Sequence, residues 1–575
     1  MSSSEDTRAT ESTNAEPRPW LSCYPQGVDW GQTFEPKPLF DLLDSAVARH
    51  GNRVCTSFLG RRQTYKEISA QVDRAAAGLQ KLGVGKGVKV GLFLPNSPTF
   101  IIYFYATLKA GGTVVNYNPL YTVEELAFQV KDSETEIMVT LDLAVLFGKV
   151  EALVSQGVLK RAIVCSFPAL LPTVKSVLFR LVKAKERARP EASAVRSKLV
   201  LEADVLANDG RYQPPAIDVG EDVAVLQYTG GTTGTPKGAM LTHANLHTNV
   251  MQVISWAPGL EDGAERVMGV LPFFHVFAMT VVMNFGISRA AEIVMMPRFE
   301  INEGLKLIDK TRPTVMPGVP TLFNAIMNHP KLKTFDLSSL KFCLSGGAPL
   351  PLEVKKGFEG LTGCKLVEGY GLSESSPVAT SNPLDGPIKE NSIGLPLPAT
   401  IISIREVGNP DKVMPLGQNG EICIKGPQVM KGYWKKAEET ANVFVGPYLR
   451  TGDVGYMDAD GFIFIVDRMK DLIICSGYNV YPRRIEEAIY EHPAVEEVTV
   501  IGIKNEYRGE APKAFVKLKT GAAATVDDIM RHLEPKLSKI ELPEEIEFRD
   551  VLPKTMIGKL SKKELKQEEE ARRKA

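Results

Sequence analysis

A glycine- and threonine-rich loop between two apolar stretches constrains the fold of this chain most. Residues 228–238 read YTGGTTGTPKG and hold four glycines, four threonines and one lysine. Glycine lets backbone N–H groups approach a ligand without interference from a Cβ, and successive N–H groups form a nest for phosphate oxygens. Apolar runs lie on both sides, at 223–226 and 239–243. A strand, an anion-binding loop and a new element are typical of an α/β fold that binds phosphate at its strand ends.

The loop does not have the P-loop spacing, in which lysine directly follows the last glycine. Thr235 and Pro236 separate Gly234 from Lys237. A plain flexible turn explains the sequence less well, because turns rarely need so many donors.

The composition indicates a globular protein without affinity for nucleic acid. The 575 residues carry 68 basic and 68 acidic side chains, so no overall positive field favours a nucleic acid partner. The seven cysteines are scattered without a CxxC pair, which favours a reduced, cytoplasmic protein without a zinc site. We expect neither a signal peptide nor a membrane span, since no apolar run reaches ~18 residues.

Helix and strand patterns alternate along the first part of the chain. Residues 39–82 show helical spacing, and predicted strands and helices then follow in turn: 88–94, 98–110, 113–116, 123–132 and 136–140. This alternation predicts an α/β fold with mainly parallel sheets. We assign residues 36–466 to a large N-terminal domain of several subdomains, and residues 1–35, rich in Ser, Thr, Glu and Pro, to a disordered lead.

A small α+β domain is predicted at the C-terminus, residues 472–575, after a linker at 467–471. Its predicted strands lie at 471–475, 495–503 and 511–518, and its predicted helices at 483–491 and 526–537. The tail from Ser561 mixes Lys, Glu and Arg and is interpreted as a solvated helix.

Five further motifs follow the loop in a fixed order. They read SGGAPL (345–350), VEGYGLSES (367–375), YLRTGD (448–453), DRMKD (467–471) and PKTMIGK (553–559). Together with the loop they resemble the adenylate-forming superfamily. From Trp20 to Glu564 the chain is most similar to bacterial long-chain fatty acid–CoA ligases. The resemblance implies that the large domain binds ATP and the acyl chain and that the small C-terminal domain is mobile.

The resemblance also implies an AMP-forming acyl-CoA synthetase that acts on a medium- to long-chain fatty acid. ATP converts the carboxylate into an acyl-adenylate with release of pyrophosphate, and coenzyme A then displaces AMP. The first step must neutralise phosphate charge and bring two anions together. Two alternatives stay open: a dicarboxylate–CoA ligase, and an acyl-AMP ligase that loads a carrier protein instead of coenzyme A.

The residues expected to bind ATP and AMP carry backbone N–H groups, hydroxyls, charges or a flat ring. They are Thr229, Gly230, Gly231, Thr232, Thr233, Gly234, Lys237, Gly346, Gly347, Ala348, Glu368, Gly369, Tyr370, Gly371, Ser373, Asp453, Ile465, Arg468 and Lys559. Tyr370 offers a face for adenine, Asp453 suits the ribose diol, and Arg468 can fork onto phosphate or ribose oxygens. Glu374 and Thr229 are expected at a Mg²⁺ site, because this hard cation prefers oxygen ligands.

Three residues are expected to be catalytic by resemblance. Lys559 bridges the substrate carboxylate and the α-phosphate, Lys237 holds the β- and γ-phosphates, and His275 lines the entrance for the carboxylate and the thiol. Lys470 matches the family's hinge, about which the small domain rotates between the half-reactions.

The path for coenzyme A is assigned to Ser476, Gly477 and Tyr478. The family commonly has Tyr-Lys-x-Pro before its final motif, whereas residues 538–543 here read SKIELP. We therefore carry over no coenzyme A phosphate contact from that segment.

Apolar segments supply the predicted walls of the acyl pocket. These are Trp256 and residues 279–287 and 315–323. A dicarboxylate would need a polar end to the pocket, for which the candidates are Asn284, Arg289 and Asn324.

Residues 174–189 predict a basic amphipathic helix. Val174, Val177, Leu178 and Leu181 fall on one helical face, and six cations surround them: Lys175, Arg180, Lys183, Lys185, Arg187 and Arg189. Such a helix lies on an anionic membrane or packs on its own protein with a solvated basic face. Both interpretations stay open, as does a homodimer. The expected location is the cytoplasm, with peripheral contact to the inner membrane face as the alternative.

Overall fold

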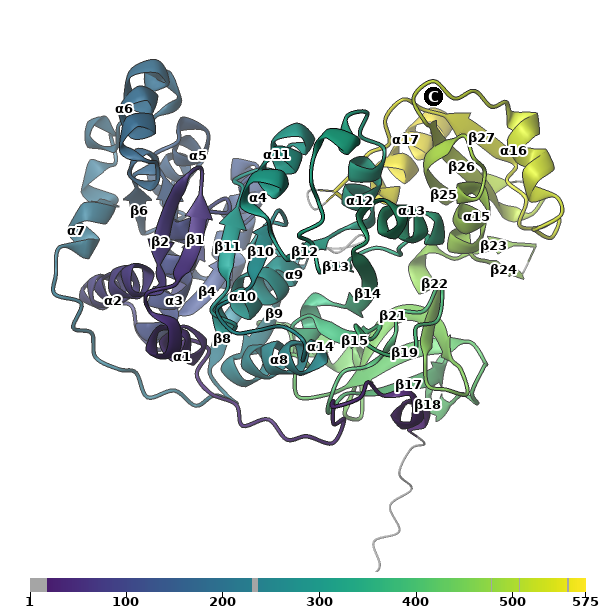
Figure 1. Ribbon diagram of the computed structural model, residues 1–575, viewed down its shortest axis with the longest axis horizontal. Coiled ribbons are helices and arrows are strands. Elements are labelled where there is room, and N and C mark those ends of the chain that lie inside the picture. Colours follow the sequence, from purple (N-terminus) through teal and green to yellow (C-terminus); the bar gives the residue numbers. More distant parts are fainter. Residues whose placement is uncertain (1–17, 230–235, 477, 506, 556–557, 575) are drawn as a thin grey trace, which may run out of the picture.

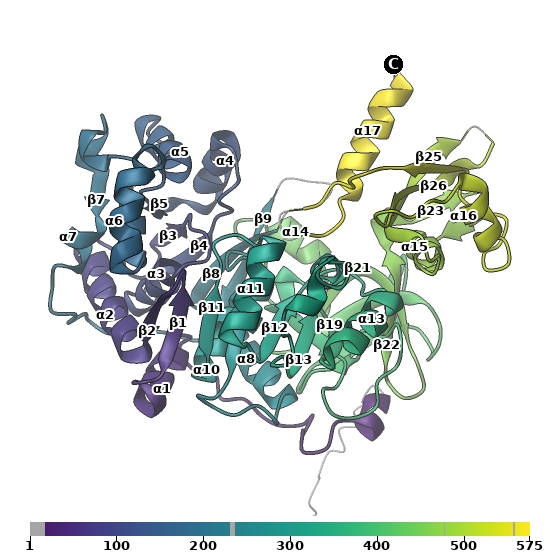
Figure 2. The same cartoon turned by 45° about the horizontal axis from the view of Figure 1, so that its top comes forward.

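The computed structural model describes residues 18–229, 236–476, 478–505, 507–555 and 558–574. Four sheets organise this part of the chain. Figures 1 and 2 both show the C-terminal sheet at one end of the molecule, beyond α12 and α13, and helix α6 at the opposite end.

The first sheet has seven strands in the order β7-β6-β5-β3-β4-β8-β9. Every neighbouring pair is parallel except β8 and β9. Its strands are β3 (Lys89–Leu92), β4 (Thr113–Asn116), β5 (Thr135–Leu141), β6 (Arg161–Cys165), β7 (Leu199–Leu201), β8 (Val223–Thr229) and β9 (Lys237–Thr242). The helices of this region are α3 (Pro98–Lys109), α4 (Val123–Ser133), α5 (Ala144–Ser155), α6 (Thr173–Val182), α7 (Glu202–Leu206) and α8 (His243–Trp256).

The second sheet has nine strands in the order β16-β15-β14-β13-β12-β10-β11-β1-β2, parallel from β14 to β1. Its strands are β1 (Val54–Phe58), β2 (Arg61–Thr64), β10 (Arg266–Gly269), β11 (Glu292–Met295), β12 (Val315–Gly318), β13 (Phe342–Ser345), β14 (Lys365–Gly371), β15 (Val378–Ser381) and β16 (Leu395–Pro396). Its helices are α1 (Asp41–His50), α2 (Tyr65–Lys81), α9 (Val276–Ala278), the π-helix η6 (Met279–Asn284), α10 (Phe285–Ser288), α11 (Ile301–Thr311), α12 (Pro320–Met327) and α13 (Leu352–Thr362).

An antiparallel sheet of six strands completes the large domain and was not predicted as a separate unit. Its strands are β17 (Ile401–Glu406), β18 (Asn409–Val413), β19 (Gly420–Lys425), β20 (Phe444–Val445), β21 (Tyr448–Met457) and β22 (Ile463–Arg468), with helix α14 (Ala437–Asn442) beside them.

The C-terminal domain has a five-stranded sheet that is antiparallel except for one pair, β26 and β27. Its elements are β23 (Ile473–Cys475), β24 (Tyr478–Val480), α15 (Pro482–Tyr490), β25 (Val495–Asn505), β26 (Gly509–Leu518), α16 (Val526–Leu533), β27 (Glu545–Phe548) and α17 (Lys562–Lys574). The mainly parallel large domain and the α+β C-terminal domain are confirmed.

Helix α3 explains the longest apolar run of the chain. All of its residues are buried, so the run is a core helix, as the sequence predicts. Among the described residues, no helix combines the length and the apolar character that crossing a membrane requires.

Residues 54–64 correct the helical interpretation of 39–82. They form the antiparallel pair β1 and β2, which separates α1 from α2. The connecting residues Leu59 and Gly60 both have positive φ, 50° and 98°. The usual hairpin signal is Asn-Gly or Asp-Gly, and a leucine at the first position conceals it. Thr64 then starts α2 in a capping box with Glu67.

The predicted disordered lead does not extend over residues 18–35. Trp20 is fully buried, and its backbone lies against Gly461. The indole N–H of Trp30 donates to the Thr400 carbonyl at 2.9 Å, and the Tyr24 hydroxyl donates to the Pro396 carbonyl at 2.8 Å. Three aromatic side chains thus anchor this segment to the large domain, which a polar composition does not reveal.

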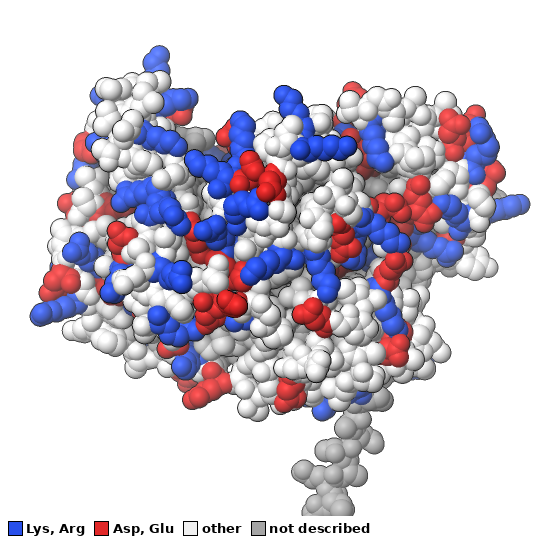
Figure 3. Space-filling model, viewed as in Figure 1, with Lys and Arg blue, Asp and Glu red and all other residues white. Residues whose placement is uncertain are grey.

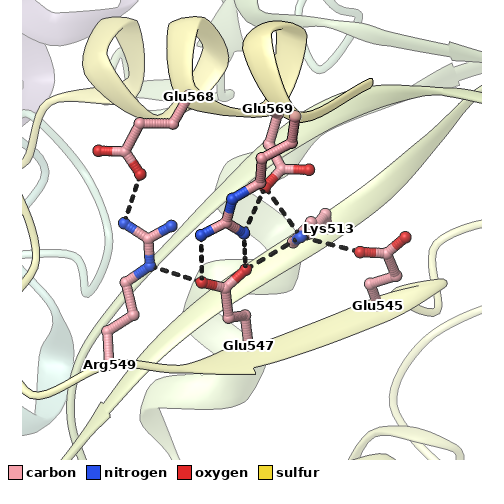
Figure 4. Close-up of polar contacts among 7 residues, drawn as sticks. Lys513, Glu545, Glu547, Arg549, Glu568 and Glu569 are labelled. Carbon is pink, nitrogen blue, oxygen red and sulfur yellow. Dashed lines mark hydrogen bonds and ion pairs between the residues drawn. The ribbon is translucent and has the colours of Figure 1, made fainter. Parts of the chain in front are cut away.

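The C-terminal tail is helical but not simply solvated, because α17 packs on the C-terminal sheet. Leu565 is fully buried. Lys513 of β26, 6% exposed, pairs with Glu545 at 2.8 Å and with Glu547 and Glu569 at 3.0 Å (Figure 4). Arg549 and Arg572 extend this network. Burial opposes ionisation of Glu547, but hydrogen bonds from Arg572, Lys513 and Arg549 lower its pKa to about 2.

Candidate active site

A cavity of about 820 Å³ lies between the large and the C-terminal domain. Strands β13 and β14 end at one wall, strands β21 and β22 supply another, and the C-terminal domain contributes the turn that carries Lys559. Twelve residues predicted as site or hinge residues line this cavity: His275, Gly347, Ala348, Glu368, Gly369, Tyr370, Gly371, Asp453, Ile465, Arg468, Lys470 and Lys559.

The two glycines after β13, Gly346 and Gly347, let neighbouring groups approach the backbone closely. A Cβ on Gly346 would lie 3.0 Å from the ring of Phe277 and 3.3 Å from the Gly369 carbonyl. Gly347 has φ +82°, and a Cβ there would lie 2.7 Å from Cε of Lys559. A side chain at position 347 would therefore displace the lysine. Gly346 is buried beneath the cavity, and Gly347 forms its surface.

Tyr370, Asp453 and Arg468 form one hydrogen-bonded group. The Tyr370 hydroxyl donates to Oδ2 of Asp453 at 2.6 Å, and Nε of Arg468 lies 3.3 Å from Oδ1 of the same carboxylate. Asp453 and Arg468 are register partners on β21 and β22. Tyr370 and Arg468, predicted for adenine and phosphate, thus both contact the carboxylate of Asp453, which is predicted for the ribose. The first and the last of these residues are 98 positions apart in sequence (370 to 468).

Lys559 enters the cavity from a tight turn of the C-terminal domain. Its amide N–H donates to Oγ1 of Thr555 at 3.2 Å, and its carbonyl accepts from the Thr555 amide at 2.6 Å. Burial lowers the pKa of Lys559 to about 8, and the nearby Arg468 guanidinium contributes to the lowering. A cation in this position is poorly solvated, so it gains strongly from an anionic ligand.

His275 is held as a neutral imidazole. Burial lowers its pKa to about 3, and the charge of Lys559 adds to the effect. Its Nδ1 accepts from the Phe277 amide at 3.2 Å, which leaves the proton on Nε2. His275 therefore caps α9 and lines the cavity.

Glu368 is, after Lys559, the second group of the cavity whose pKa lies near neutrality. Burial raises its pKa to about 7, opposed by the Arg483 guanidinium of the C-terminal domain. Its Oε1 accepts from the Leu350 amide at 3.1 Å. The Arg483 guanidinium thus favours the ionised form of this carboxyl group.

Lys237, Thr229 and Glu374 gather outside the lining of the cavity. β8 and β9 pair Thr229 with Lys237, and the short helix η8 (Ser373–Ser375) packs against both strands. The Tyr433 hydroxyl donates to Oε1 of Glu374 at 2.7 Å, and Nζ of Lys237 lies 5.2 Å from the Tyr433 ring centroid. A cation and a carboxylate thus face one tyrosine. The predicted loop residues between the strands, Gly230, Gly231, Thr232, Thr233 and Gly234, lie outside the described residues.

The new element after the loop is a strand. β9 runs antiparallel to β8 and forms a hairpin with it.

The predicted hinge coincides with a break between two sheets. β22 ends at Arg468, the short helix η9 (Met469–Asp471) follows, and β23 begins the C-terminal domain. Burial lowers the pKa of Lys470, and Arg468 adds to the effect. The predicted coenzyme A residues Ser476 and Tyr478 are exposed on β23–β24, outside the lining of the cavity, and Gly477 lies outside the described residues.

A second, apolar cavity of about 40 Å³ lies within the large domain. It includes several predicted acyl-pocket walls and is lined by Val253, Trp256, Ala257, Val281, Phe285, Val315, Pro317, Phe342, Leu344, Val367, Val378, Ser381, Leu384 and Leu397. The stretches that contribute to both cavities include the segment from His275 through α10, β12 with α12, β13 with its following loop, and β14. Of the described residues around the apolar cavity, only Ser381 is polar.

The three candidates for a polar pocket end are engaged elsewhere. Oδ1 of Asn284 accepts from the Tyr105 hydroxyl at 2.8 Å. Arg289 pairs with Asp262 at 3.0 Å and also donates to two carbonyls. Asn324 donates to the Glu496 carbonyl at 3.0 Å. None of the three lines the apolar cavity, and Asn324 lines the larger one.

Sequence reasoning missed Arg483 and Tyr433, and it included Tyr228 in the loop without assigning it a role. Tyr228 and Arg483 line the large cavity, and Tyr433 joins Glu374 to Lys237. The signals are modest: Tyr228 directly precedes the Gly/Thr loop, and Tyr433 stands in a Lys-Gly-Tyr-Trp run. Arg483 follows Tyr481-Pro482 at the start of a helix and has no distinguishing pattern.

Known families and proteins match the chain over nearly its whole length. Residues 43–434 match the AMP-binding enzyme family, and residues 484–559 match the AMP-binding enzyme C-terminal domain. A long-chain-fatty-acid–CoA ligase of Bacillus subtilis (strain 168) is 43% identical over 564 residues, which cover 96% of this chain and 98% of the relative. A protein of the same name from Yersinia pestis is 37% identical with the same coverage.

Among solved structures, ATP-bound MatB from Rhodopseudomonas palustris is similar to this chain. The TM-score is 0.80 at 27% identity, and the match covers 93% of this chain and 99% of MatB.

Proposed function

The chain belongs to the AMP-binding enzyme family, and from this premise we propose that it is an ATP-dependent fatty acyl-CoA synthetase. A fatty carboxylate oxygen attacks the α-phosphorus of ATP, the bond to pyrophosphate breaks, and an acyl-adenylate forms. The sulfur of coenzyme A then attacks the acyl carbonyl, AMP leaves, and the thiol proton is released to solvent.

The observation that carries the proposal is the position of Lys559. Its side chain lies against Gly347 at the end of β13, next to the Tyr370–Asp453–Arg468 group. An ammonium with a pKa of about 8 is poorly solvated, and it stabilises an anionic carboxylate and phosphate brought together there. Arg468 supplies a second fixed cation, so the repulsion between the two anionic substrates is offset.

The residues around Glu374 suit magnesium, which prefers oxygen ligands. Among the described residues no cluster of three or more His, Cys, Asp or Glu could hold a metal. The ion would instead be held by the Glu374 carboxylate, the Thr229 hydroxyl and phosphate oxygens, since Mg²⁺ usually binds one or two carboxylates together with its nucleotide. When bound, it would neutralise phosphate charge. The same neutralisation is proposed for Lys237, on the other side of Tyr433.

The second half-reaction requires Lys559 to withdraw, because the thiol must reach the same carbonyl. We assign the movement to a rotation at Lys470, which lies in the η9 break between two sheets. Such a rotation would bring another face of the C-terminal domain to the cavity. We propose that this face includes the exposed hairpin of Ser476 and Tyr478, as the coenzyme A path requires.

A long acyl chain is proposed to occupy the apolar cavity. The segment from His275 to Phe285 leads from the nucleotide cavity to the apolar one. A π-helix in such a segment is often a functional feature. The apolar cavity holds only about 40 Å³, so its walls must open to admit a chain. The name of the Bacillus subtilis relative, a long-chain-fatty-acid–CoA ligase, supports the same substrate class.

The test is AMP release by the purified enzyme with monocarboxylic and dicarboxylic acids of increasing length. Sustained AMP release should need ATP, a fatty acid and coenzyme A together, and should be highest with medium- to long-chain monocarboxylates. Turnover with a carrier protein but not with coenzyme A would identify a carrier-loading ligase. A preference for dicarboxylates would contradict the fatty acid assignment.

We also propose that α6 touches an anionic membrane, from which the enzyme takes its lipid substrate. Its apolar stripe is not covered: Val174, Val177, Leu178, Leu181 and Val182 are between 54% and 79% exposed. The helix packs on the domain through Phe179, whose ring centroid lies 5.0 Å from that of Phe167. α6 lies at the upper left of Figure 1, and in Figure 3 uncharged atoms there lie beside Lys and Arg side chains.

The cations around α6 contribute less than their number suggests. Lys175 donates to the Leu59 carbonyl at 2.8 Å, Lys183 pairs with Glu186 at 2.5 Å, and Arg187 pairs with Asp142 at 2.7 Å. Arg180, Lys185 and Arg189 are exposed and would face anionic headgroups. The apolar side chains therefore carry most of the proposed binding.

Co-sedimentation with phosphatidylglycerol vesicles tests this contact. The double substitution Leu178→Ser and Leu181→Ser should reduce binding at least tenfold, since each buried leucine contributes ~1.5–3 kcal/mol. Leu361→Ser with Leu416→Ser is a matched control, because these leucines are 53% and 50% exposed elsewhere. If the wild type does not bind anionic vesicles at low salt, the membrane proposal is wrong.

A further inference from the structure

Helix α12 of the large domain contacts the C-terminal domain through two polar side chains. Oγ1 of Thr321 donates to the carbonyl of Gly558 at 2.6 Å. Nδ2 of Asn324 donates to the carbonyl of Glu496 at 3.0 Å. Thr321 and Asn324 are three residues apart and therefore lie on one face of the helix. Both line the large cavity.

The first of these bonds acts directly on the lysine turn. Gly558 precedes Lys559 and has φ +83°, a conformation that favours glycine. Its amide donates to the Thr555 carbonyl at 2.8 Å, so the turn is closed on itself. A Cβ on Gly558 would lie 3.2 Å from Oγ1 of Thr321 and 3.3 Å from Val319. The start of α12 thus supports the turn at the residue next to the lysine.

The second bond holds β25, a strand that also contacts Lys554, five residues before Lys559. Nδ2 of Asn328 donates to Oδ1 of Asn324 at 2.7 Å, which directs the Asn324 amide group toward Glu496. The next residue on β25, Glu497, accepts a hydrogen bond from Lys554 at 2.5 Å. Asn324 therefore fixes the same body from which Lys559 projects.

We propose that Thr321 and Asn324 are positioning residues that hold Lys559 in the cavity for adenylation and release it for thioester formation. The inference rests on the proposed function. Both donors belong to the large domain and both acceptors to the C-terminal domain, so neither bond survives a rotation between them. The two bonds favour the adenylating orientation alone.

The two half-reactions separate this role from a general structural one. Adenylation is measured as fatty-acid-dependent exchange of pyrophosphate into ATP, and thioester formation as acyl-CoA made from supplied acyl-adenylate. Thr321→Val preserves shape and removes the donor. It should slow exchange about 3- to 10-fold, the effect of one hydrogen bond, and leave thioester formation unchanged or faster.

Three further variants make the result specific. Thr321→Ser keeps the hydroxyl and should restore exchange. Asn324→Ala should act like Thr321→Val and protects the test if one variant folds poorly, which thermal unfolding will reveal. Thr334→Val is the control, because the Thr334 hydroxyl donates to the Lys331 carbonyl at 2.8 Å within an exposed turn.

The outcomes are distinct. Equal slowing of both half-reactions in folded Thr321→Val and Asn324→Ala, or no slowing in either, would overturn the positioning role. If the wild type itself lacks fatty-acid-dependent exchange, the proposed function fails, whatever the variants do.

Discussion

Apolar cores stabilise each domain internally, whereas mainly polar contacts join the large domain to the C-terminal domain. One continuous apolar core extends through the large domain from Trp20 to Ile463 and includes residues of three sheets. The C-terminal domain has separate cores, one around Ile473 and one around Leu565. No described hydrophobic residue beyond Ile465 belongs to the first core or packs against it.

The contacts between the domains are mainly polar. Besides Thr321 and Asn324, the Arg483 amide donates to Oδ2 of Asp467 at 2.9 Å, and Nη1 of Arg483 donates to the Ile465 carbonyl at 2.9 Å. Apolar burial is non-directional and large, whereas each net hydrogen bond contributes only ~1 kcal/mol and depends on orientation. The interface therefore defines an orientation that a modest free energy can change.

The largest expected effect is that of Lys559→Ala, which removes the group that the C-terminal domain brings to the cavity. Adenylation should fall ~10²–10³-fold, because a charge contact to the developing bond is lost. Thioester formation from supplied acyl-adenylate should be largely preserved. Rapid mixing with ATP and fatty acid, and separately with acyl-adenylate, measures the two rates.

Lys539→Ala is the matched control, since Lys539 is an exposed lysine of the same domain. Equal loss of both half-reactions in Lys559→Ala would mean that the lysine does not act in one orientation only.

Leu565→Ala tests whether the two domains are separate cooperative units. Leu565 is fully buried between α17 and the C-terminal sheet, and such a truncation costs ~2–5 kcal/mol of unfolding free energy. Hydrogen exchange should accelerate in residues 472–574 and remain unchanged in the large domain.

Val551→Ala, at a residue 75% exposed in the same domain, is the control and should change little. Faster exchange throughout both domains in Leu565→Ala would show that they unfold as one unit.

Acid should lower the unfolding free energy of the large domain, because three histidines are neutral in the folded chain and become protonated on unfolding. Burial lowers the pKa of His243 and His247 to about 4, and that of His275 to about 3. The unfolded chain binds protons at these positions below pH 6.5, whereas the folded chain does not. Their stabilising contribution is therefore complete above pH 6.5 and is lost as pH falls toward 4, by ~1.4 kcal/mol per pH unit for each histidine.

His243→Asn isolates one of these contributions. Asparagine can still accept the Leu39 amide, which donates to Nδ1 of His243 at 3.0 Å. The pH dependence of unfolding by urea should become shallower by about one proton between pH 6 and 4.5. The difference between variant and wild type removes the pH-dependent contributions that both share. One of these is Glu368, whose raised pKa lowers the unfolding free energy as pH rises. An unchanged slope would contradict a neutral buried His243.

The smallest expected effect is that of Glu374→Gln, within the large domain. The amide preserves shape and removes the charge proposed to face Mg²⁺. The Mg²⁺ concentration for half-maximal activity should rise about tenfold, which corresponds to ~1.4 kcal/mol. Glu438→Gln, at an exposed glutamate, is the control. An unchanged Mg²⁺ titration would remove Glu374 from the metal site.

The sequence predicts local features of the fold well where pattern and length agree. Helices α3 and α4 and strands β4, β5, β25 and β26 lie within a few residues of their predicted positions. The β1–β2 hairpin was missed because its Leu59-Gly60 turn lacks the usual residues. The anchoring of Trp20 was missed because a local pattern does not reveal a partner such as Gly461, more than 400 residues away in sequence.

The cavity itself could be predicted only as a set of motifs. Resemblance grouped Tyr370, Asp453, Arg468 and Lys559, and the structure brings them to one place. Arg483 escaped prediction because its role depends on the packing of α15 against β22, which brings a helix of one domain to the edge of the other. Tertiary contact of this kind leaves no local signature.

The backbone carbonyls that accept from α12 have a consequence for variation. Thr321 and Asn324 contact Gly558 and Glu496 through groups that every residue carries, so these bonds place no demand on the side chain at position 496. A C-terminal domain from another member of the family could preserve both contacts while its surface differs. Substitutions of the side chain at position 496 can therefore accumulate without loss of the Asn324 contact.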